Sequence, residues 1–193
     1  MSSENLSECK ELFKDHVQTA LLKQRTITIF GEITQKAARD FTEKLMVLAG
    51  ESKDSIRVII NSPGGHVESG DTIFDMIRFV GLRILMIGTG RVASAGALIY
   101  SAPPREDRFS LPNTRFMLHQ PSGGVGGSAS DAEIEAKEII KMRERLNRTF
   151  AERTGQSLGQ VTKDSDRNFW MSPKQAVEYG LAGKVIRSVD ELK

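Results

Sequence analysis

The stretch ILMIGTGRVASAGALIYSA, from Ile84 to Ala102, decides how the rest of the chain is organised. Its apolar start, Ile84 to Ile87, predicts a short buried strand that the two following glycines break. The apolar run from Ala95 to Ala102 predicts a short helix, which two prolines at positions 103 and 104 end. Ser94 therefore stands where a strand turns into a helix.

Ser94 has two interpretations at this junction. A residue at a helix start lies beside unpaired backbone N–H groups, which favour negative charge developing nearby and so suit a nucleophile. The ordinary alternative is that the Ser94 hydroxyl only caps the helix. The stretch by itself leaves both open.

Composition restricts the class of protein. The chain has 193 residues, 39% hydrophobic and 27% charged, which fits one globular domain over residues 1–193. The net charge of +2 is made by scattered residues, so we expect neither nucleic acid nor a membrane as a partner. No signal peptide or run of about 20 apolar residues is present, so a cytoplasmic location is expected.

Metals and disulfides are not expected. Cys9 is the one cysteine, so no internal disulfide can form, and a reducing compartment fits this use of cysteine. The three histidines are His16, His66 and His119, and none is paired with cysteine at the spacing of zinc ligands. We expect no cofactor.

Strands and helices alternate along the chain. Apolar positions at steps of three and four residues predict an amphipathic helix or arm within residues 1–24. Thr34 and Gly50 are expected to begin and end the next helix. The expected strands are 25–31, 55–60, 84–87, 115–120 and 184–189, and the expected later helices are 67–80, 95–102, 129–153 and 172–180.

The turn Asn61-Ser62-Pro63-Gly64-Gly65 joins a strand to a helix. Such a turn is usually structural. Paired glycines also let a backbone N–H approach a bound group at a helix start, where an oxyanion is favoured. Two successive strand–helix units would place this turn and Ser94 at one edge of a sheet.

His119 ends a short predicted strand on that same edge. A histidine there is more often structural than catalytic, but His119 is the only histidine placed beside Ser94. The loop Pro121 to Ser128, PSGGVGGS, is either flexible or an extended edge whose backbone pairs with a peptide. It lacks the Gly-Lys-Ser/Thr ending of a phosphate-binding loop.

The long helix after this loop is predicted to begin with a capping box of Ser130 and Glu133 and to end at Gly155. Its apolar positions cover more than one face, which indicates an oligomer contact. Ser172 and Gln175 form a second capping box, which starts the last helix.

These motifs, taken in order, resemble one family. The set is Asn61 to Gly65, Ala93-Ser94-Ala95-Gly96, His119-Gln120-Pro121 with Gly123-Gly124, Thr154-Gly155-Gln156, and Ser172 to Gly180. It is similar to the proteolytic subunit of the ATP-dependent Clp protease, the ClpP family, over roughly residues 21–189. The resemblance implies an α/β fold, a crotonase-like spiral of βα units with a protruding long helix.

The resemblance also implies a mechanism. Ser94 corresponds to the nucleophile of a serine endopeptidase and His119 to its general base. The N–H groups of Gly65 and Ala95 correspond to the oxyanion hole. The residues implied to bind substrate as paired strands are His66, Val67, Ser122, Gly123, Gly124 and Val125.

The resemblance implies an assembly as well. Family members stack two heptameric rings into a tetradecamer through the long helix, here 129–153, and enclose a chamber that an AAA+ ATPase feeds with unfolded polypeptide. Asp166 and Arg167 match a pair that joins the rings and couples assembly to activity.

The position of the triad's acid is different in this chain. Counting from His119 without a gap, it falls on Asn168. An asparagine oxygen can accept from the histidine ring but cannot stabilise the imidazolium by charge, and the same exchange in a well-known serine protease costs on the order of ten-thousand-fold in rate. We therefore expect a slow or conditional protease.

The N-terminus differs too. The family opens with an apolar, proline-containing segment that helps to engage the ATPase, whereas residues 1–20 here read as polar and helical. We expect either poor ATPase docking or a mixed assembly in which a second ClpP paralogue supplies that face.

Three other functions compete with this interpretation. A crotonase-like acyl-CoA enzyme shares the fold but needs no serine and histidine at these two turns. An α/β-hydrolase requires glycine at position 92, where this chain has Val92, and it is excluded. A catalytically silent structural subunit is the alternative that Asn168 favours.

Overall fold

The core of the molecule is a mainly parallel β-sheet. The computed structural model describes residues 15–123 and 128–192. Within them, five parallel strands lie side by side in the order β1, β2, β3, β4, β7. Their bounds are Thr26–Phe30, Ile56–Ser62, Ile84–Ala93, Arg108–Ser110 and Lys184–Val185.

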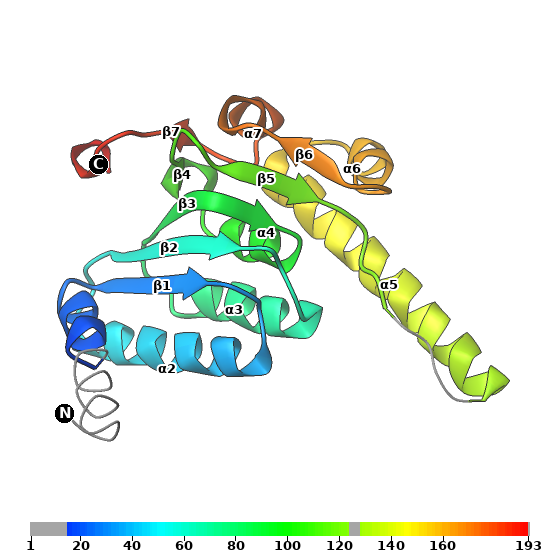
Figure 1. Ribbon diagram of the computed structural model, residues 1–193, viewed down its shortest axis with the longest axis horizontal. Coiled ribbons are helices and arrows are strands. Elements are labelled where there is room, and N and C mark those ends of the chain that lie inside the picture. The colour runs from blue at the N-terminus through cyan, green and yellow to red at the C-terminus, as the bar shows by residue number, and fades with distance from the viewer. Residues whose placement is uncertain (1–14, 124–127, 193) are drawn as a thin grey trace, which may run out of the picture.

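Helices α2 (Gln35–Glu51) and α3 (Val67–Phe79) cover one face of this sheet (Figure 1). Each helix turns an apolar stripe toward the strands, because its apolar residues recur at helical spacing. The short helix α4 (Ala95–Tyr100) is buried along its whole length. The buried stripe of α2 consists of Ala38, Phe41, Leu45 and Leu48, and that of α3 includes Ile73, Phe74 and Ile77.

Strand β3 is longer than the sequence predicts. It was expected to break at the glycines, but it continues through Gly88 and Gly90 to Ala93. The physical reason is a change of partner, because residues 86–88 pair with β4 while residues 91–93 pair with β5 (Arg115–Leu118). Gly90, at φ +59°, lies at the irregular step between the two pairings.

Two short elements that the sequence did not reveal extend the sheet. Strand β6 (Phe169–Met171) pairs antiparallel with β5, and helix α6 (Leu158–Asp164) precedes it. Strand β4 lies between the expected helix 95–102 and the expected strand 115–120, where no element was expected, and it follows the single turn η1 (Arg105–Asp107). Helix α7 (Pro173–Tyr179) begins with the predicted capping box of Ser172 and Gln175.

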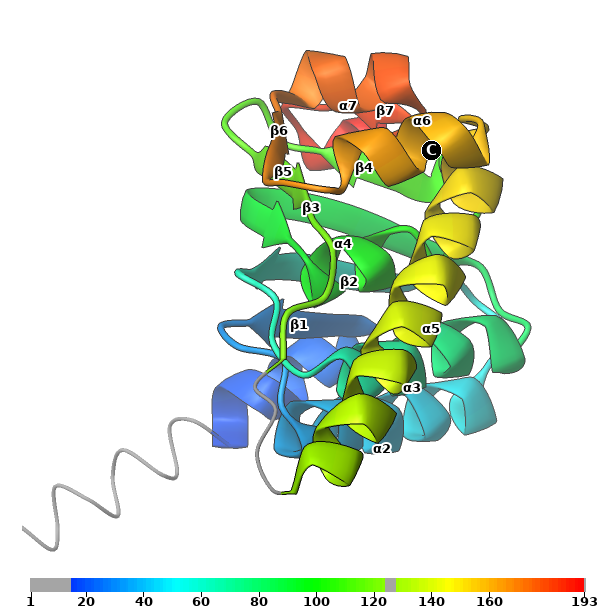
Figure 2. The same cartoon turned by 90° about the vertical axis from the view of Figure 1, so that its right-hand side faces the viewer.

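Helix α5 (Ala129–Thr154) is the long helix that the sequence predicts (Figure 1). It projects beyond the sheet, and its C-terminal half crosses beside α4 and α6 (Figure 2). Its capping box is formed by Ser128 and Asp131 rather than by the expected Ser130 and Glu133. The helix starts at Ala129, so residue 130 already lies inside its first turn, while Gly155 closes it in the left-handed conformation as predicted.

Other helix and strand ends also differ from the expectations. Thr34 caps α2 as predicted, but the helix passes through Gly50 and ends at Glu51, followed by Ser52. The last strand stops at Val185, and the single turn η2 (Val189–Glu191) follows where the strand was expected to continue. Residues 15–23 are helical, whereas residues 1–14 of the predicted arm, with Cys9, lie outside the described residues.

Arg108 donates hydrogen bonds to backbone carbonyls at the ends of three helices. Its guanidinium is buried and donates to the carbonyls of Pro103, Arg153 and Leu181 at 2.8, 2.9 and 3.1 Å. These carbonyls follow α4, end α5 and follow α7, respectively. Burial and the neighbouring Arg153 guanidinium lower the pKa of Arg108 to about 10.

We predict that Arg108→Met lowers the free energy of unfolding by about 3 kcal/mol or more, because it leaves several buried carbonyls without a donor. Urea unfolding checks this against Arg148→Met, which removes an exposed arginine of helix α5. Equal midpoints for the two variants would contradict the role given to Arg108.

Candidate active site

Ser94 lies in a strained turn between β3 and α4. Its backbone has φ +55° and ψ −125°, and among the described residues only Arg25 is another non-glycine residue with a positive φ. A non-glycine residue in such a conformation costs on the order of 1–3 kcal/mol and is held by its surroundings. The Ser94 N–H donates to the Met117 carbonyl at 2.9 Å, which continues the pairing of β3 with β5.

The Ser94 hydroxyl contacts His119 and does not cap the helix. Ser94 Oγ and His119 Nε2 lie 2.8 Å apart, and the side chain makes no capping hydrogen bond to α4. The capping interpretation of Ser94 is therefore wrong, and its interpretation as a nucleophile stays a prediction. His119 directly follows β5, so the pairing of β3 with β5 brings the two side chains together.

The surroundings of His119 favour its neutral form. The ring is half-buried, and burial lowers the pKa of His119 from its ordinary value of 6.5. A neutral ring can accept the serine proton at Nε2, which is what a general base requires.

The Gly64–Gly65 turn packs directly against Ser94. A side chain at Gly64, at φ +100°, would come within 2.5 Å of Ser94 Cβ. Gly65, at φ +148°, is pressed against Ile33, whose N–H donates to the Gly64 carbonyl and whose carbonyl accepts from the His66 N–H. Among the described residues, no hydrogen bond uses the Gly65 N–H.

The second predicted oxyanion donor is the N–H of Ala95, the first residue of α4. A first-turn N–H has no carbonyl partner inside its own helix. Gly70 of α3 lets α3 approach this point, because a Cβ there would lie 3.1 Å from Ala95 Cβ. The turns that carry Gly65 and Ala95 therefore meet around Ser94.

Asn168 lies opposite His119 at the end of the β5–β6 ladder. Leu118 pairs with Phe169, and the next position along this antiparallel register sets His119 opposite Asn168. Asn168 is exposed, and within the described residues it makes no hydrogen bond to His119. The structure thus forms a serine–histidine pair and brings position 168 beside it.

The loop before Asn168 is tied to α5. Buried Ser165 donates to the Asn147 side-chain oxygen at 2.9 Å, and the Ser165 carbonyl accepts from the Gln120 N–H. The Gln120 side chain donates to the Asp166 carbonyl at 2.8 Å and accepts from Arg143. These contacts fix the course of the loop, and no pattern in the sequence indicates them.

The residues expected to bind substrate are partly described. His66 caps α3. Its N–H donates to the Ile33 carbonyl, and its carbonyl accepts from the Gly70 N–H. The backbone of His66 can therefore offer a peptide only the second lone pair of its carbonyl oxygen. Ser122 and Gly123 are exposed beside α5, where a Cβ on Gly123 would lie 3.0 Å from Ile139. Gly124 and Val125 lie outside the described residues.

A small apolar pocket lies next to Ser94 and His119. Of the apolar residues that line it, only Val67 and Ala95 are site residues that the sequence predicts. The helical spacing of four between Ser94 and Leu98 was the available signal for one of the others. The further apolar lining residues are Leu98, Leu118, Pro121, Leu146 and Phe150.

Asp166 and Arg167 are both exposed and form a 4.0 Å ion pair with each other. Solvent screens such a pair, so it contributes little to the stability of one subunit. The Asp166 carboxylate also accepts a 3.4 Å hydrogen bond from the Gln120 side chain.

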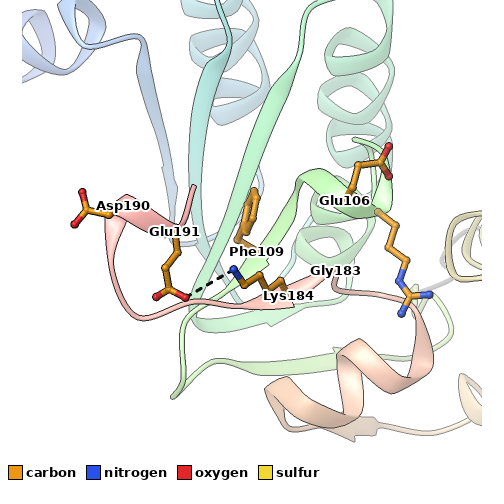
Figure 3. Close-up of a pocket in the computed structure, with 7 residues that line it drawn as sticks. Glu106, Phe109, Gly183, Lys184, Asp190 and Glu191 are labelled. Atoms are coloured by element: carbon orange, nitrogen blue, oxygen red, sulfur yellow. Dashed lines mark ion pairs between the residues drawn. The ribbon is translucent and has the colours of Figure 1, made fainter. Parts of the chain in front are cut away.

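A larger hollow of about 670 Å³ lies elsewhere, beside β4 and β7 (Figure 3). Lys184 and Glu191 approach to 3.9 Å across it, with Glu106 and Phe109 on its walls. Its lining includes none of the predicted site residues that the structure describes.

Over residues 15–123 and 128–192, no helix is apolar and long enough to cross a membrane, and no group of His, Cys, Asp or Glu is arranged to hold a metal ion.

The arrangement defines a class of protein. A serine hydroxyl at hydrogen-bond distance from a half-buried histidine, flanked by the Gly65 turn and by the start of helix α4 at Ala95, is typical of a serine hydrolase. The parallel sheet with its strand–helix turns at one edge supplies the scaffold.

Comparison with known proteins gives the family. The Clp protease family model matches residues 9–189. The ATP-dependent Clp protease proteolytic subunit 2 of Gluconobacter oxydans is 62% identical over 90% of this chain and 78% of its own, and subunit 3 of Rhizobium meliloti is 56% identical over 89% and 88%. The chain belongs to the Clp protease family, a family of serine peptidases.

Solved structures agree with this assignment. ClpP1 from Listeria monocytogenes superimposes with a TM-score of 0.83 at 51% identity, covering 92% of this chain and 99% of that one. A variant of the same protein with an asparagine-to-aspartate substitution gives a TM-score of 0.86. The predicted ClpP fold is therefore confirmed.

We predict that the His119 ring titrates below pH 6.5, because burial disfavours its charged form. The unfolded chain then takes up this proton at a higher pH than the folded chain, so His119 lowers stability as the pH falls through 6.5 and below. NMR titration of ¹³C-labelled histidine, with the signal assigned through His119→Gln, checks this. A midpoint at or above 6.5 would contradict the effect of burial.

Proposed function

We propose that the protein is a serine endopeptidase subunit that cleaves unfolded polypeptide, with Ser94 as nucleophile and His119 as general base. The 2.8 Å contact between Ser94 Oγ and His119 Nε2 carries this proposal. The family membership and the two glycine- and alanine-containing turns around Ser94 support it.

The reaction follows from the geometry. As Ser94 Oγ attacks the peptide carbonyl carbon, its proton passes to His119 Nε2. The N–H groups of Gly65 and Ala95 donate to the oxyanion that develops on the carbonyl oxygen. His119 then gives its proton to the leaving amine. In the second half of the reaction His119 takes a proton from the water that attacks the acyl carbonyl, and it returns this proton to Ser94 Oγ as the bond to the acyl group breaks.

Substrate binding is assigned to His66 and Val67 and to Ser122, Gly123, Gly124 and Val125, of which the last two lie outside the described residues. The pocket beside Ser94 has apolar walls and a volume of only about 20 Å³, so it favours a small apolar side chain on the residue before the cleaved bond over a charged one, which would lose its hydration without gaining a partner.

The assembly is proposed by family membership. The chain is one domain that forms heptameric rings, which α5 joins into a double ring with contacts from Asp166 and Arg167. An AAA+ ATPase supplies unfolded substrate in the cytoplasm. A second paralogue is proposed as a ring partner, and several relatives are numbered as subunit 2 or 3.

Asn168 makes the activity slow or conditional. Its amide cannot stabilise the imidazolium by charge when His119 takes the proton, and its NH₂ group competes with its oxygen for the ring. A silent structural subunit is the second candidate, and the exposed Asn168 side chain without a bond to His119 favours it. An acyl-CoA enzyme gains no support from the Ser94–His119 contact.

We predict that a fluorophosphonate labels Ser94 of the purified protein, because His119 activates its hydroxyl despite Asn168. Intact mass spectrometry detects one added phosphonyl group per subunit, with native mass spectrometry run in parallel to establish the assembly. Ser94→Ala serves as the control and takes up no label. An assembled double ring that stays unlabelled would establish the silent subunit instead.

We predict that Asn168→Asp raises kcat for a fluorogenic peptide by tenfold or more, because a carboxylate stabilises the imidazolium that forms during attack. Asn113→Asp adds the same charge on an exposed turn outside the site and is the matched control. Equal kcat for Asn168→Asp and the parent, with the native mass unchanged, would show that position 168 does not act on His119.

A further inference from the structure

Ser62 contacts both turns that carry the proposed oxyanion donors. It is the last residue of β2 and is completely buried. Its register partner is Val92, two residues before Ser94. The β2–β3 pairing shifts between Ile60 and Ser62, so Ser62 stands just past an irregularity, where the ladder alone does not fix the backbone.

The first contact of Ser62 is polar. Its Oγ accepts a hydrogen bond from the Gly64 N–H at 3.1 Å, and Gly64 is itself buried. This bond closes the turn one residue before Gly65. A buried N–H that loses its acceptor costs free energy, so the turn would rotate to find another partner.

The second contact is steric. A Cβ placed on Gly96 would lie 3.1 Å from Ser62 Cβ, 3.3 Å from its carbonyl oxygen and 3.4 Å from its Oγ. The backbone of Gly96 therefore rests on Ser62, one residue after Ala95. Ser62 is thus hydrogen-bonded to Gly64, the residue before the donor Gly65. It is also packed against Gly96, the residue after the donor Ala95.

We propose that Ser62 is a positioning residue that sets the relative placement of the Gly65 and Ala95 N–H groups. The proposal rests on the proposed peptidase function. Ser62 Oγ bonds the backbone of the Gly64 turn, so its effect on the reaction passes through that turn. An oxyanion hole works only when its donors are placed where the charge develops, and removing one donor costs about 10²–10³ in kcat.

The test compares Ser62→Ala with Ser110→Ala. Ser110 is also completely buried at the end of a strand of the same sheet, and its Oγ also makes one bond to a backbone group, the Leu111 carbonyl. Ser62→Cys keeps nearly the same shape with a weaker acceptor, and it carries the test if Ser62→Ala does not assemble. Native mass and thermal midpoint are recorded for every variant.

The expected result is a fall in kcat of about tenfold or more in Ser62→Ala with KM within about twofold of the parent, because only the charged intermediate needs the aligned donors. The kcat of Ser62→Cys lies between those of Ser62→Ala and the parent, and Ser110→Ala keeps the parental kcat. Affinity for a peptide boronate, which places an oxygen in the oxyanion hole, falls in parallel, while affinity for the non-covalent product peptide does not.

Two failures are distinguishable. Parental kcat and boronate affinity in Ser62→Ala or Ser62→Cys would overturn the role of Ser62 while leaving the peptidase intact. A parent protein that neither hydrolyses peptide nor takes up fluorophosphonate would overturn the peptidase function, and the oxyanion role of Ser62 with it.

Discussion

The active site depends on one structural constraint, the change of partner along β3. Its first half pairs with β4 and its second half with β5, so the chain after Ala93 turns at the point where β5 ends. The Ser94 N–H continues that second pairing to Met117 and fixes the serine in its strained conformation. His119 lies two residues beyond Met117, at hydrogen-bond distance from the hydroxyl.

Close backbone packing around Ser94 follows from that constraint. Gly64, Gly70 and Gly96 each face a neighbouring turn or helix at a distance that leaves little or no room for a side chain. This packing holds two loops and a helix start against one residue, which is how a strained serine is kept in place. Arg108 performs a related task beneath the site, where it satisfies carbonyls at three helix ends.

Position 168 lies where an acid could face His119, but its side chain is an amide. The β5–β6 register brings Asn168 opposite His119, and α5 holds the preceding loop through Asn147 and Gln120. The scaffold that would present an acid is therefore built, but the side chain is an amide. In the proposed mechanism, this one functional group decides the charge beside the histidine, whereas the backbone pairing that places position 168 does not depend on it.

The sequence by itself determined the order of the longer strands and helices along the chain, though not β4, α6 or β6. It also determined the caps at Thr34 and Ser172 and the grouping of Ser94, Gly65 and His119 at one sheet edge, because these follow from local periodicity and turn chemistry. It could not determine where β3 ends, because glycines that break an isolated strand are tolerated where two partners share it. Nor could it find β6, the pocket walls or the double contact of Ser62. Those depend on residues far apart in the chain, and only the tertiary structure sets their distances.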